Sequence, residues 1–499
     1  MFVFSILFIY ADSGILLSGR WKVMALPRPP VGEGVEVLFK PKGVAVIGAS
    51  RKPGKVGYMV LYNLKNSYEG PIYPVNPNAD EILGLKAYPT IMDVPDPVDL
   101  AVVTVPAKMV PDVVDQAGRR GVRAVIVISA GFREVGGEGV ELEKRLLEVV
   151  RKHGIRMLGP NCLGVYSPST GINATFLDPE KQGLPGKGPI AFISQSGALG
   201  AALLDWLDAN QFGISKFISI GNKADIDEAD LLAYLRKDPE TKSIAMYIEG
   251  VAPGEGGRFR RALEETTHEK PVVILKSGRT AAGARAASSH TGSLAGSYQL
   301  YETIFKQTGV IPAYDTAQLF EMALALALQP PMLGDRVAII TMGGGSGVMA
   351  SDNLAEKGLK VVELSPETQA KLRKVLLPIA SPRNPVDVTG SATDEHFLES
   401  IRIVVESGEV DGIFLIPYLN LASITPELPR KIAALVKEIQ QKYRIPFVAS
   451  VTAGKKTWAL AKIMEKEAGI PVYSNEASAA RAMWALRQYG KWLQKIGVA

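Results

Sequence analysis

Short apolar runs recur along this chain of 499 residues, and stretches with helical spacing of apolar and polar positions lie between them. Runs of this length are typical of strands buried on both faces, and their alternation with helices indicates parallel sheets covered by helices. The pattern therefore predicts an α/β fold. The expected strands form three groups: residues 44–47, 72–75, 100–105 and 124–129; residues 190–193, 216–220, 243–248 and 272–275; and residues 337–341, 359–362, 412–416 and 446–451.

Breaks in this pattern predict the domain organisation. The first unit, over residues 27–166, is expected to be Rossmann-like, with helices near residues 109–119 and 140–153. The Pro- and Gly-rich segment 167–188 is expected to be a linker. Two flavodoxin-like units should follow over residues 189–329 and 334–499, because each opens with a strand, a Gly/Ser turn and a helix.

The N-terminal extension, residues 1–26, is apolar over residues 2–10 but too short to span a bilayer. It lacks the basic start and the cleavage site of a secretory signal. We expect the extension to be dispensable and favour Met24 over Met1 as the true start; a real membrane anchor is the alternative. No other apolar run approaches membrane length, which predicts a cytoplasmic protein without membrane contact.

Composition narrows the function classes. Apolar residues make up 47% of the chain and charged residues 21%, as in globular proteins. The net charge of +5 comes without a basic arm or stripe, so nucleic acid is excluded as an expected partner, although phosphorylated substrates remain compatible. Cys162 is the single cysteine, which excludes an intrachain disulfide and a cysteine-based zinc cluster.

The segment VAVIGASRKPGKVG, residues 44–57, predicts a strand, a glycine-rich turn and a helix. Backbone N–H groups of such a turn bind phosphate at the helix N-terminus. A dinucleotide site would need an acidic residue after the second strand, but the chain has YPVNPN at residues 73–78 there. We therefore expect a phosphate-bearing nucleotide cofactor other than NAD, which coenzyme A fits; a turn without a ligand is the alternative.

His290 is the histidine with the most distinctive setting, because it lies among small residues in SSHTGSLAGS, residues 288–297. A loop of Ser, Gly and Ala can move and can approach a ligand closely. An imidazole placed there suits a nucleophile that takes a group at one place and delivers it at another. The loop should follow the strand at residues 271–275 and precede a helix from Tyr298. A histidine without a special role in a loop is the alternative.

Two turns are candidate phosphate sites because each opens a helix after a buried strand. Either turn alone is equally explained as an ordinary N-cap, whereas two of them fit a phosphate held at each end of a path. The first turn has Ser194, Gln195, Ser196 and Gly197, and the second has Gly344, Gly345 and Ser346.

Acidic residues suggest two further features. Glu249 ends an apolar strand that belongs to the expected sheet of His290, and a carboxylate there would fix the imidazole tautomer and stabilise the phosphorylated ring. A solvated strand-end glutamate is the alternative. The acidic segment GNKADIDEAD, residues 221–230, is expected to be a solvated helix start rather than a metal site. We predict no metal site on this chain.

Six motifs in order resemble the α subunits of the ADP-forming (NDP-forming) acetyl-CoA synthetases, relatives of succinyl-CoA synthetase. The resemblance runs from about Val35 to the C-terminus. It implies a CoA-binding Rossmann-like domain followed by two succinyl-CoA-ligase-type domains, the first a ligase-CoA domain with a phosphohistidine loop. The motifs are GASRKPGKVG, YPVNPN, GPNCLG, SQSGALG, SIGNKADIDEADLL and SHTGSLAG.

The resemblance also implies roles for individual residues. His290 would be phosphorylated, Glu249 would be its partner, and Asn161 would lie near the acyl phosphate with the two phosphate turns. The residues expected to hold CoA are Gly48, Ala49, Ser50, Lys52, Pro53, Gly54, Val75, Asn76, Pro77, Val105 and Pro106.

The implied reaction is acyl-CoA + ADP + phosphate ⇌ acid + ATP + CoA, through an acyl phosphate and a phosphohistidine. An ATP-grasp β subunit, in an α2β2 assembly, would carry ADP or ATP with Mg²⁺. A non-catalytic CoA-sensing protein and an NAD-dependent oxidoreductase are the rival functions. The sequence leaves open the acyl group and the choice between ADP and GDP.

Overall fold

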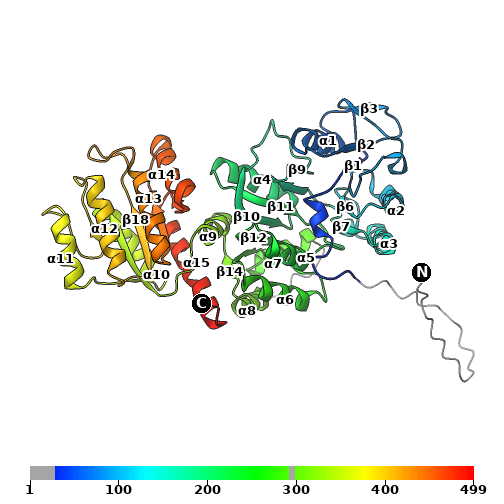
Figure 1. The fold of residues 1–499 in the computed structure, drawn as a ribbon. Coiled ribbons are helices and arrows are strands. Elements are labelled where there is room, and N and C mark those ends of the chain that lie inside the picture. The colour runs from blue at the N-terminus through cyan, green and yellow to red at the C-terminus, as the bar shows by residue number, and fades with distance from the viewer. Residues whose placement is uncertain (1–27, 292–297, 499) are drawn as a thin grey trace, which may run out of the picture.

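The computed structural model describes residues 28–291 and 298–498, and its three large sheets define three units in the order of the chain (Figure 1). The second unit lies in the middle, with the first and third units on either side of it. Helices cover the faces of each sheet. The predicted α/β class, with one Rossmann-like and two flavodoxin-like units, is confirmed.

The first unit has five parallel strands in the order β2-β1-β5-β6-β7. The side chains of β1, β5, β6 and β7 are buried throughout, which explains the continuous apolar runs in the sequence. The elements are β1 (Val44–Ile47), α1 (Val56–Ser67), β2 (Ile72–Val75), β3 (Glu81–Ile82), β4 (Leu85–Lys86), β5 (Leu100–Val103), α2 (Val110–Arg120), β6 (Ala124–Val127), α3 (Glu138–His153) and β7 (Arg156–Leu158).

The second unit has a seven-stranded sheet in the order β14-β13-β12-β10-β11-β8-β9. Strands β10 to β14 are parallel to one another, whereas β8 and β9 form an antiparallel edge beside β11. The elements are β8 (Gly164–Ser167), β9 (Ile172–Asn173), β10 (Lys187–Ser194), α4 (Gly197–Ala209), β11 (Ile214–Ser219), α5 (Glu228–Lys237), β12 (Ser243–Ile248), α6 (Gly256–Thr267), β13 (Val272–Lys276), α7 (Ala281–Thr291), α8 (Tyr298–Thr308), β14 (Ile311–Ala313) and α9 (Thr316–Leu328).

The third unit has a six-stranded parallel sheet with β15 and β18 at its centre. The elements are β15 (Arg336–Thr341), α10 (Gly344–Glu356), β16 (Lys360–Val361), α11 (Pro366–Val375), β17 (Val386–Asp387), α12 (Asp394–Glu406), β18 (Gly412–Ile416), α13 (Leu428–Lys442), β19 (Phe447–Ser450), α14 (Lys455–Ala468), β20 (Val472–Tyr473) and α15 (Glu476–Lys495).

The segment 167–188, expected to be a linker, is built into the second unit. Strand β9 pairs with β8, which pairs with β11 at the edge of the sheet. Asn63 of α1 donates hydrogen bonds of 2.9 Å and 2.8 Å to the carbonyl oxygens of Thr175 and Leu177. The segment therefore joins the first unit to the second, and the predicted boundary does not separate them.

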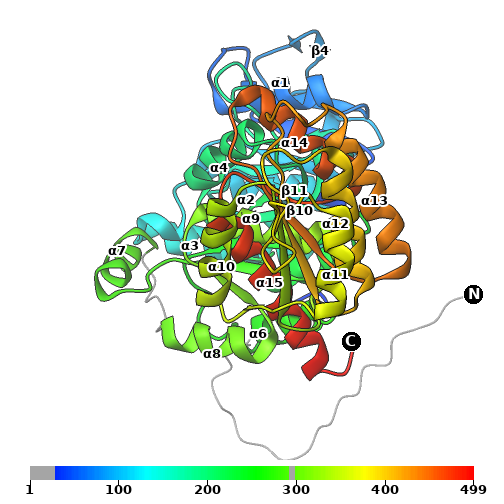
Figure 2. The same ribbon diagram turned by 90° about the vertical axis from the view of Figure 1, so that its left-hand side faces the viewer.

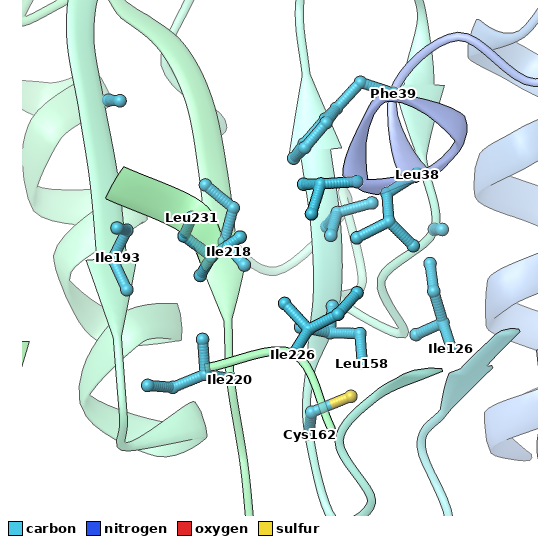
Figure 3. Packing of buried hydrophobic residues seen from close by; sticks show 14 of the residues in the cluster. Leu38, Phe39, Ile126, Leu158, Cys162, Ile193, Ile218, Ile220, Ile226 and Leu231 are labelled. Carbon is cyan, nitrogen blue, oxygen red and sulfur yellow. The ribbon is translucent and has the colours of Figure 1, made fainter. Parts of the chain in front are cut away.

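A single hydrophobic core joins the first and second units (Figure 3). It extends from Ile193 of the second sheet to Ile126 of the first, with Ile226 and Leu158 between them. Leu38 and Phe39 pack into the same cluster, and both are fully buried. Shared burial of this kind makes the relative position of the two sheets part of the folded core.

A buried ionic cluster lies at the same boundary. The Asp225 carboxylate accepts hydrogen bonds from Arg156 Nε at 3.1 Å and from Met157 N at 2.8 Å. Asp230 pairs with Arg156 at 3.1 Å and with Arg258 at 2.7 Å. Burial opposes the charge on Asp230, but Arg156 and the other donors outweigh it and lower its pKa.

This cluster corrects the expectation of a solvated helix start over residues 221–230. Asp227 does cap α5, accepting from the backbone N–H groups of Ala229 and Asp230. The carboxylates are nevertheless buried, because cations distant in sequence, Arg156 and Arg258, compensate their charge. Among the described residues, no group of three or more acidic, His or Cys side chains is arranged to hold a metal ion.

The second and third units are joined by helices α9 and α15, which pack against each other (Figure 1). Phe320 of α9 makes an edge contact with Phe192 at 5.0 Å between ring centroids, and it shares a buried cluster with Leu486 and Trp492 of α15. Glu321 of α9 forms a 2.8 Å ion pair with Arg481. No helix in the described part of the chain is long and apolar enough to cross a membrane.

Asp230→Ala should lower the free energy of unfolding by about 3 kcal/mol, because it removes a buried carboxylate from the buried Arg156 and the partly buried Arg258. Chemical denaturation followed by circular dichroism measures the change. Glu141→Ala, which breaks the exposed 2.7 Å pair with Lys144, is the matched control and should cost less than about 1 kcal/mol. Equal effects of the two substitutions would contradict a stabilising role for the buried cluster.

Candidate functional site

The predicted nucleotide loop follows β1 and leads into α1. Gly48 has a φ of +92°, and a Cβ atom there would lie 2.8 Å from Thr104 Oγ1. A Cβ atom on Gly57 would lie 2.1 Å from the carbonyl oxygen of Gly48. Only glycine allows the backbone of the turn to pass so close to the start of the helix. Beyond it, Lys52, Pro53 and Gly54 are exposed to solvent.

Asn76 connects this loop to the end of β2. Its Nδ2 donates to the carbonyl oxygen of Ala49 at 2.7 Å, and its Oδ1 accepts from the N–H of Asn78 at 2.8 Å. Strands β2, β1 and β5 are neighbours in the parallel sheet, so their carboxyl ends lie at one edge. The structure therefore brings together, at this edge, the predicted CoA residues that follow each of the three strands: residues 48–54, 75–77 and 105–106.

Asn161 lies where the first unit meets the second. Its backbone has a φ of +57°, its N–H donates to Ser129 O at 3.0 Å, and its Nδ2 lies 3.4 Å from Asn222 Oδ1. Ser129 follows β6 of the first sheet, and Asn222 follows β11 of the second. Asn161 itself is exposed, so its amide is accessible beside both sheets.

The turn of residues 194–197 differs in one respect from the prediction that its hydroxyls face an anion. Ser194 Oγ donates to Ser196 O at 2.7 Å, and Ser196 Oγ caps α4 by accepting from Leu199 N at 3.3 Å. Both hydroxyls are therefore engaged in hydrogen bonds within the turn. The Ser196 bond is a helix cap, which stabilises the first turn of α4. The backbone N–H groups and the dipole of α4 are the elements of this turn that could attract an anion.

Gln195 joins this turn to Glu249, a connection that sequence analysis missed. Its Oε1 accepts from the N–H of Glu249 at 2.8 Å and from the N–H of Gly250 at 3.3 Å. The Glu249 side chain is buried, with 7% of its surface exposed, and Tyr247 Oη donates to its Oε1 at 3.4 Å. The alternative of a solvated strand-end glutamate is thus wrong.

Two buried lysines flank the Glu249–Gly250 corner, and the sequence did not single them out. Lys223 Nζ donates to the carbonyl oxygen of Gly250 and pairs with Glu228. Lys276 ends β13, beside β12, which leads to Glu249. Burial lowers the pKa of Lys276, and the nearby Glu249 charge opposes this shift. The corner therefore combines a carboxylate with two ammonium groups in a poorly solvated region.

His290 lies in the last turn of α7, so the predicted loop begins later than Ser288. Residues 292–297 of that loop are outside the described residues. Helix α7 follows β13 and projects from the side of the second unit (Figure 2). Because β13 pairs with β12, the chain leading to His290 starts beside Glu249, as expected from the sequence. The expected helix from Tyr298 is α8.

The second phosphate turn, at Gly344, Gly345 and Ser346, begins α10. Ser346 Oγ lies 2.8 Å from Tyr418 Oη, which orients this hydroxyl toward β18 and its following loop. A Cβ atom on Gly344 would lie 3.0 Å from Asp387 Oδ2. Asp387 ends β17, the neighbour of β15, so a carboxylate missed by sequence analysis lies beside this turn.

Comparisons with known proteins match most of the chain. The family model for a CoA binding domain matches residues 42–168, that for a succinyl-CoA ligase-like flavodoxin domain matches residues 187–326, and that for a Ligase-CoA domain matches residues 337–490. The α subunit of acetate–CoA ligase (ADP-forming) II of Pyrococcus furiosus is 42% identical, over 92% of this chain and 98% of its own.

The isoenzyme I α subunit of the same organism is 43% identical over 92% of this chain and 99% of its own. The chain belongs to the family of ADP-forming acetate–CoA ligase α subunits. In solved structures, acetyl-coenzyme A synthetase 1 of Ca. Korarchaeum cryptofilum, in complex with phosphate and ADP, is similar with a TM-score of 0.84 and 38% identity. The alignment covers 93% of this chain and 98% of that one. The Ligase-CoA description, expected for residues 189–329, thus matches the third unit of this family member.

Cys162 follows Asn161 in the GPNCLG motif. Its surroundings indicate whether its thiol could act as a nucleophile. Its side chain is buried, its Sγ lies 3.4 Å from Val127 O, and burial raises the pKa of the thiol to about 12. A neutral, buried thiol is a poor nucleophile.

Iodoacetamide at about pH 8 should therefore leave Cys162 unmodified in the native protein and alkylate it after unfolding in guanidinium. Mass spectrometry of the intact chain measures the modification. Rapid alkylation of the native protein would show that the thiol is accessible and ionised, and would make it a candidate nucleophile.

Proposed function

We propose that this chain is the catalytic α subunit of an acid–CoA ligase that carries out acyl-CoA + ADP + phosphate ⇌ acid + ATP + CoA. Acetyl-CoA is the acyl donor we favour, because the similar α subunits are named for acetate. The Gln195 contact supports the proposal most strongly, because it links the helix turn directly to the backbone of Glu249. Membership of a ligase family does not favour a non-catalytic CoA sensor.

The proposed reaction starts with CoA at the carboxyl edge of the first sheet. Two features support this placement. The turn at Gly48 has no side chain at the start of a helix, where phosphate groups bind, and the amide of Asn76 holds the loop in position. Inorganic phosphate attacks the thioester carbonyl, the C–S bond breaks, and CoA leaves as the thiol. The product is an acyl phosphate, with Asn161 beside it at the boundary of the two units.

His290 then takes over the phosphoryl group. An imidazole nitrogen attacks phosphorus, the bond from phosphorus to the acyl oxygen breaks, and the acid leaves as its carboxylate. Glu249 accepts from the other imidazole nitrogen and stabilises the charge of the phosphorylated ring. The helix N-termini at Gln195 and Gly344 supply positive potential for the transferred group.

The last step transfers the phosphoryl group from His290 to ADP. We propose that ADP is bound by an ATP-grasp β subunit in an α2β2 assembly, with Mg²⁺ accompanying the nucleotide. The α-subunit names of the relatives support a separate partner. The proposal requires His290 to move between the two subunits, because the phosphoryl group must reach the nucleotide on the partner.

His290→Ala should abolish protein phosphorylation when the chain, purified with its partner, is incubated with acetyl-CoA and labelled phosphate. The label should be acid-labile and base-stable, as expected for phosphohistidine. His396→Ala is the control, because His396 only caps α12 by accepting from Thr393 N at 3.0 Å, and should retain the label. Labelling that persists in His290→Ala would refute the mechanism, and CoA binding without labelling would favour a sensor.

Asn76→Ala should weaken CoA binding about tenfold, since the loop loses the hydrogen bond that positions Ala49 O. Isothermal titration of CoA into the purified chain gives the dissociation constant. Asn66→Ala is the matched control, because the Asn66 amide bonds only within α1, to Tyr62 O at 2.9 Å. If Asn66→Ala weakened binding as much as Asn76→Ala, the CoA site would have to lie elsewhere.

A further inference from the structure

Asn222 is a buried asparagine at the boundary of the first two units, and the proposed reaction so far gives it no role. It follows β11 of the second sheet, and 8% of its surface is exposed. Its Nδ2 donates to Glu134 Oε2 at 2.6 Å and to Glu143 Oε2 at 2.8 Å, both in the first unit. Its Oδ1 lies 3.4 Å from Asn161 Nδ2. Asn222 therefore connects two acidic side chains to the amide that we place beside the acyl phosphate.

The acidic side chains fix which way the Asn222 amide points. An amide donates through its nitrogen and accepts through its oxygen, whereas an ionised carboxylate only accepts. Burial opposes the charge of Glu134, but the Asn222 side chain and backbone N–H donors outweigh it and lower the Glu134 pKa. Burial raises the pKa of Glu143, and Arg133 and Asn222 oppose this shift. Turned over, the Asn222 amide would place its oxygen against the Glu134 carboxylate, so the oxygen faces Asn161 instead.

The direction of the Asn222 amide in turn determines that of Asn161. An acceptor requires a donor opposite it, so the nitrogen of the Asn161 amide has to face Asn222. This contact uses one of the two N–H groups on that nitrogen, and Asn161 is exposed, so an acceptor on a bound substrate can reach the second. The length of 3.4 Å is compatible with a contact that tightens when substrate binds.

The loops that carry the two asparagines are also held together by their main chains. The N–H of Asn222 donates to Pro160 O at 2.8 Å. A Cβ atom on Gly221 would lie 2.4 Å from the same oxygen, so glycine is needed for this close approach. These main-chain contacts do not involve the Asn222 side chain. Its amide can therefore be removed without separating the loops, and its effect on Asn161 can be measured.

We propose that Asn222 is a positioning residue that holds the Asn161 amide with an N–H directed at the acyl oxygen when phosphate attacks the thioester. The proposal rests on the proposed function and deepens it. Attack of a phosphate oxygen on the carbonyl carbon places negative charge on the carbonyl oxygen before the C–S bond breaks and CoA leaves. A preorganised N–H donor stabilises this charge, whereas an amide turned the other way would present its own oxygen and repel it.

The rate of CoA release tests this role, because it follows cleavage of the C–S bond directly. The chain, purified with its partner, is mixed with acetyl-CoA and saturating phosphate, and the CoA released in a single turnover is measured after rapid quenching. Asn222→Ala removes the acceptor that orients Asn161, so the rate at saturation should fall about tenfold. The dissociation constant of CoA should be nearly unchanged. Weaker CoA binding with an unchanged rate at saturation would overturn the inference.

Asn63→Ala is the matched control for loss of contacts between the units. Asn63 is also a buried asparagine, and its Nδ2 donates two hydrogen bonds across the same boundary, to Thr175 O and Leu177 O. Its partners are backbone oxygens of the segment after β9, so its removal should weaken the boundary without turning the Asn161 amide. CoA release should remain nearly as fast as in the unmodified enzyme. Equal slowing by Asn63→Ala and Asn222→Ala would show that Asn222 only joins the units, which would overturn the inference.

Glu134→Gln tests the same chain of contacts without removing Asn222, and it decides the matter if Asn222→Ala fails to fold. Glu134 Oε1 accepts from the N–H groups of Gly131 at 2.6 Å and Phe132 at 3.1 Å. The substituted side chain should keep its oxygen on these donors, so its nitrogen would face Asn222 and favour the reversed amide. CoA release should slow about tenfold, and an unchanged rate would overturn the inference.

A double variant shows whether Asn222 acts through Asn161. Asn161→Ala should slow CoA release about 100-fold, because the donor itself is lost. In that background Asn222→Ala should have little further effect, since there is no amide left to orient. Independent losses from the two substitutions would overturn the inference. Absence of phosphate-dependent CoA release in the unmodified enzyme would instead refute the proposed function, so the two failures are distinguishable.

Discussion

The buried contact of Arg156 with Asp225 and Asp230 determines how the first sheet meets the second. Arg156 begins the edge strand β7, and Asp225 also accepts a hydrogen bond from the backbone of that strand. The second unit therefore contacts the first through both main-chain and side-chain hydrogen bonds. Removing one partner of such a buried pair is costly, because it leaves the other charge buried without compensation. The carboxyl edge of the first sheet and the Glu249 corner are therefore held in a fixed relation by the shared core.

Within this arrangement, the site depends on a general property of parallel sheets, whose strand ends collect at one edge. Lys276 ends β13, Glu249 directly follows the neighbouring strand β12, and Gln195 follows β10 of the same sheet. Beyond the end of β12, the Gln195 side-chain oxygen accepts hydrogen bonds from the backbone N–H groups of Glu249 and Gly250. A short side chain at residue 195 would leave both donors without this acceptor.

The long elements were predictable from local pattern, and the remote contacts were not. The central strands and the helices α2 and α3 follow from continuous apolar runs and helical spacing. Strands β8 and β9 were missed because such short edge strands have no periodicity, and β9 also lies in the Pro- and Gly-rich segment. The carboxylates of residues 225–230 were expected in solvent because the pattern does not show that Arg156 and Arg258 reach them. Glu249 and His290 were identifiable from their motifs, whereas Lys276 and Asp387 gain their meaning only from neighbouring strands.

The attachment of the third unit has a consequence for how such a chain can be divided during evolution. Helix α15, at the far end of the sequence, packs against α9 of the second unit through apolar and ionic contacts that do not depend on the connecting peptide. A gene split near Pro330 would therefore yield two polypeptides that still recognise each other through this face.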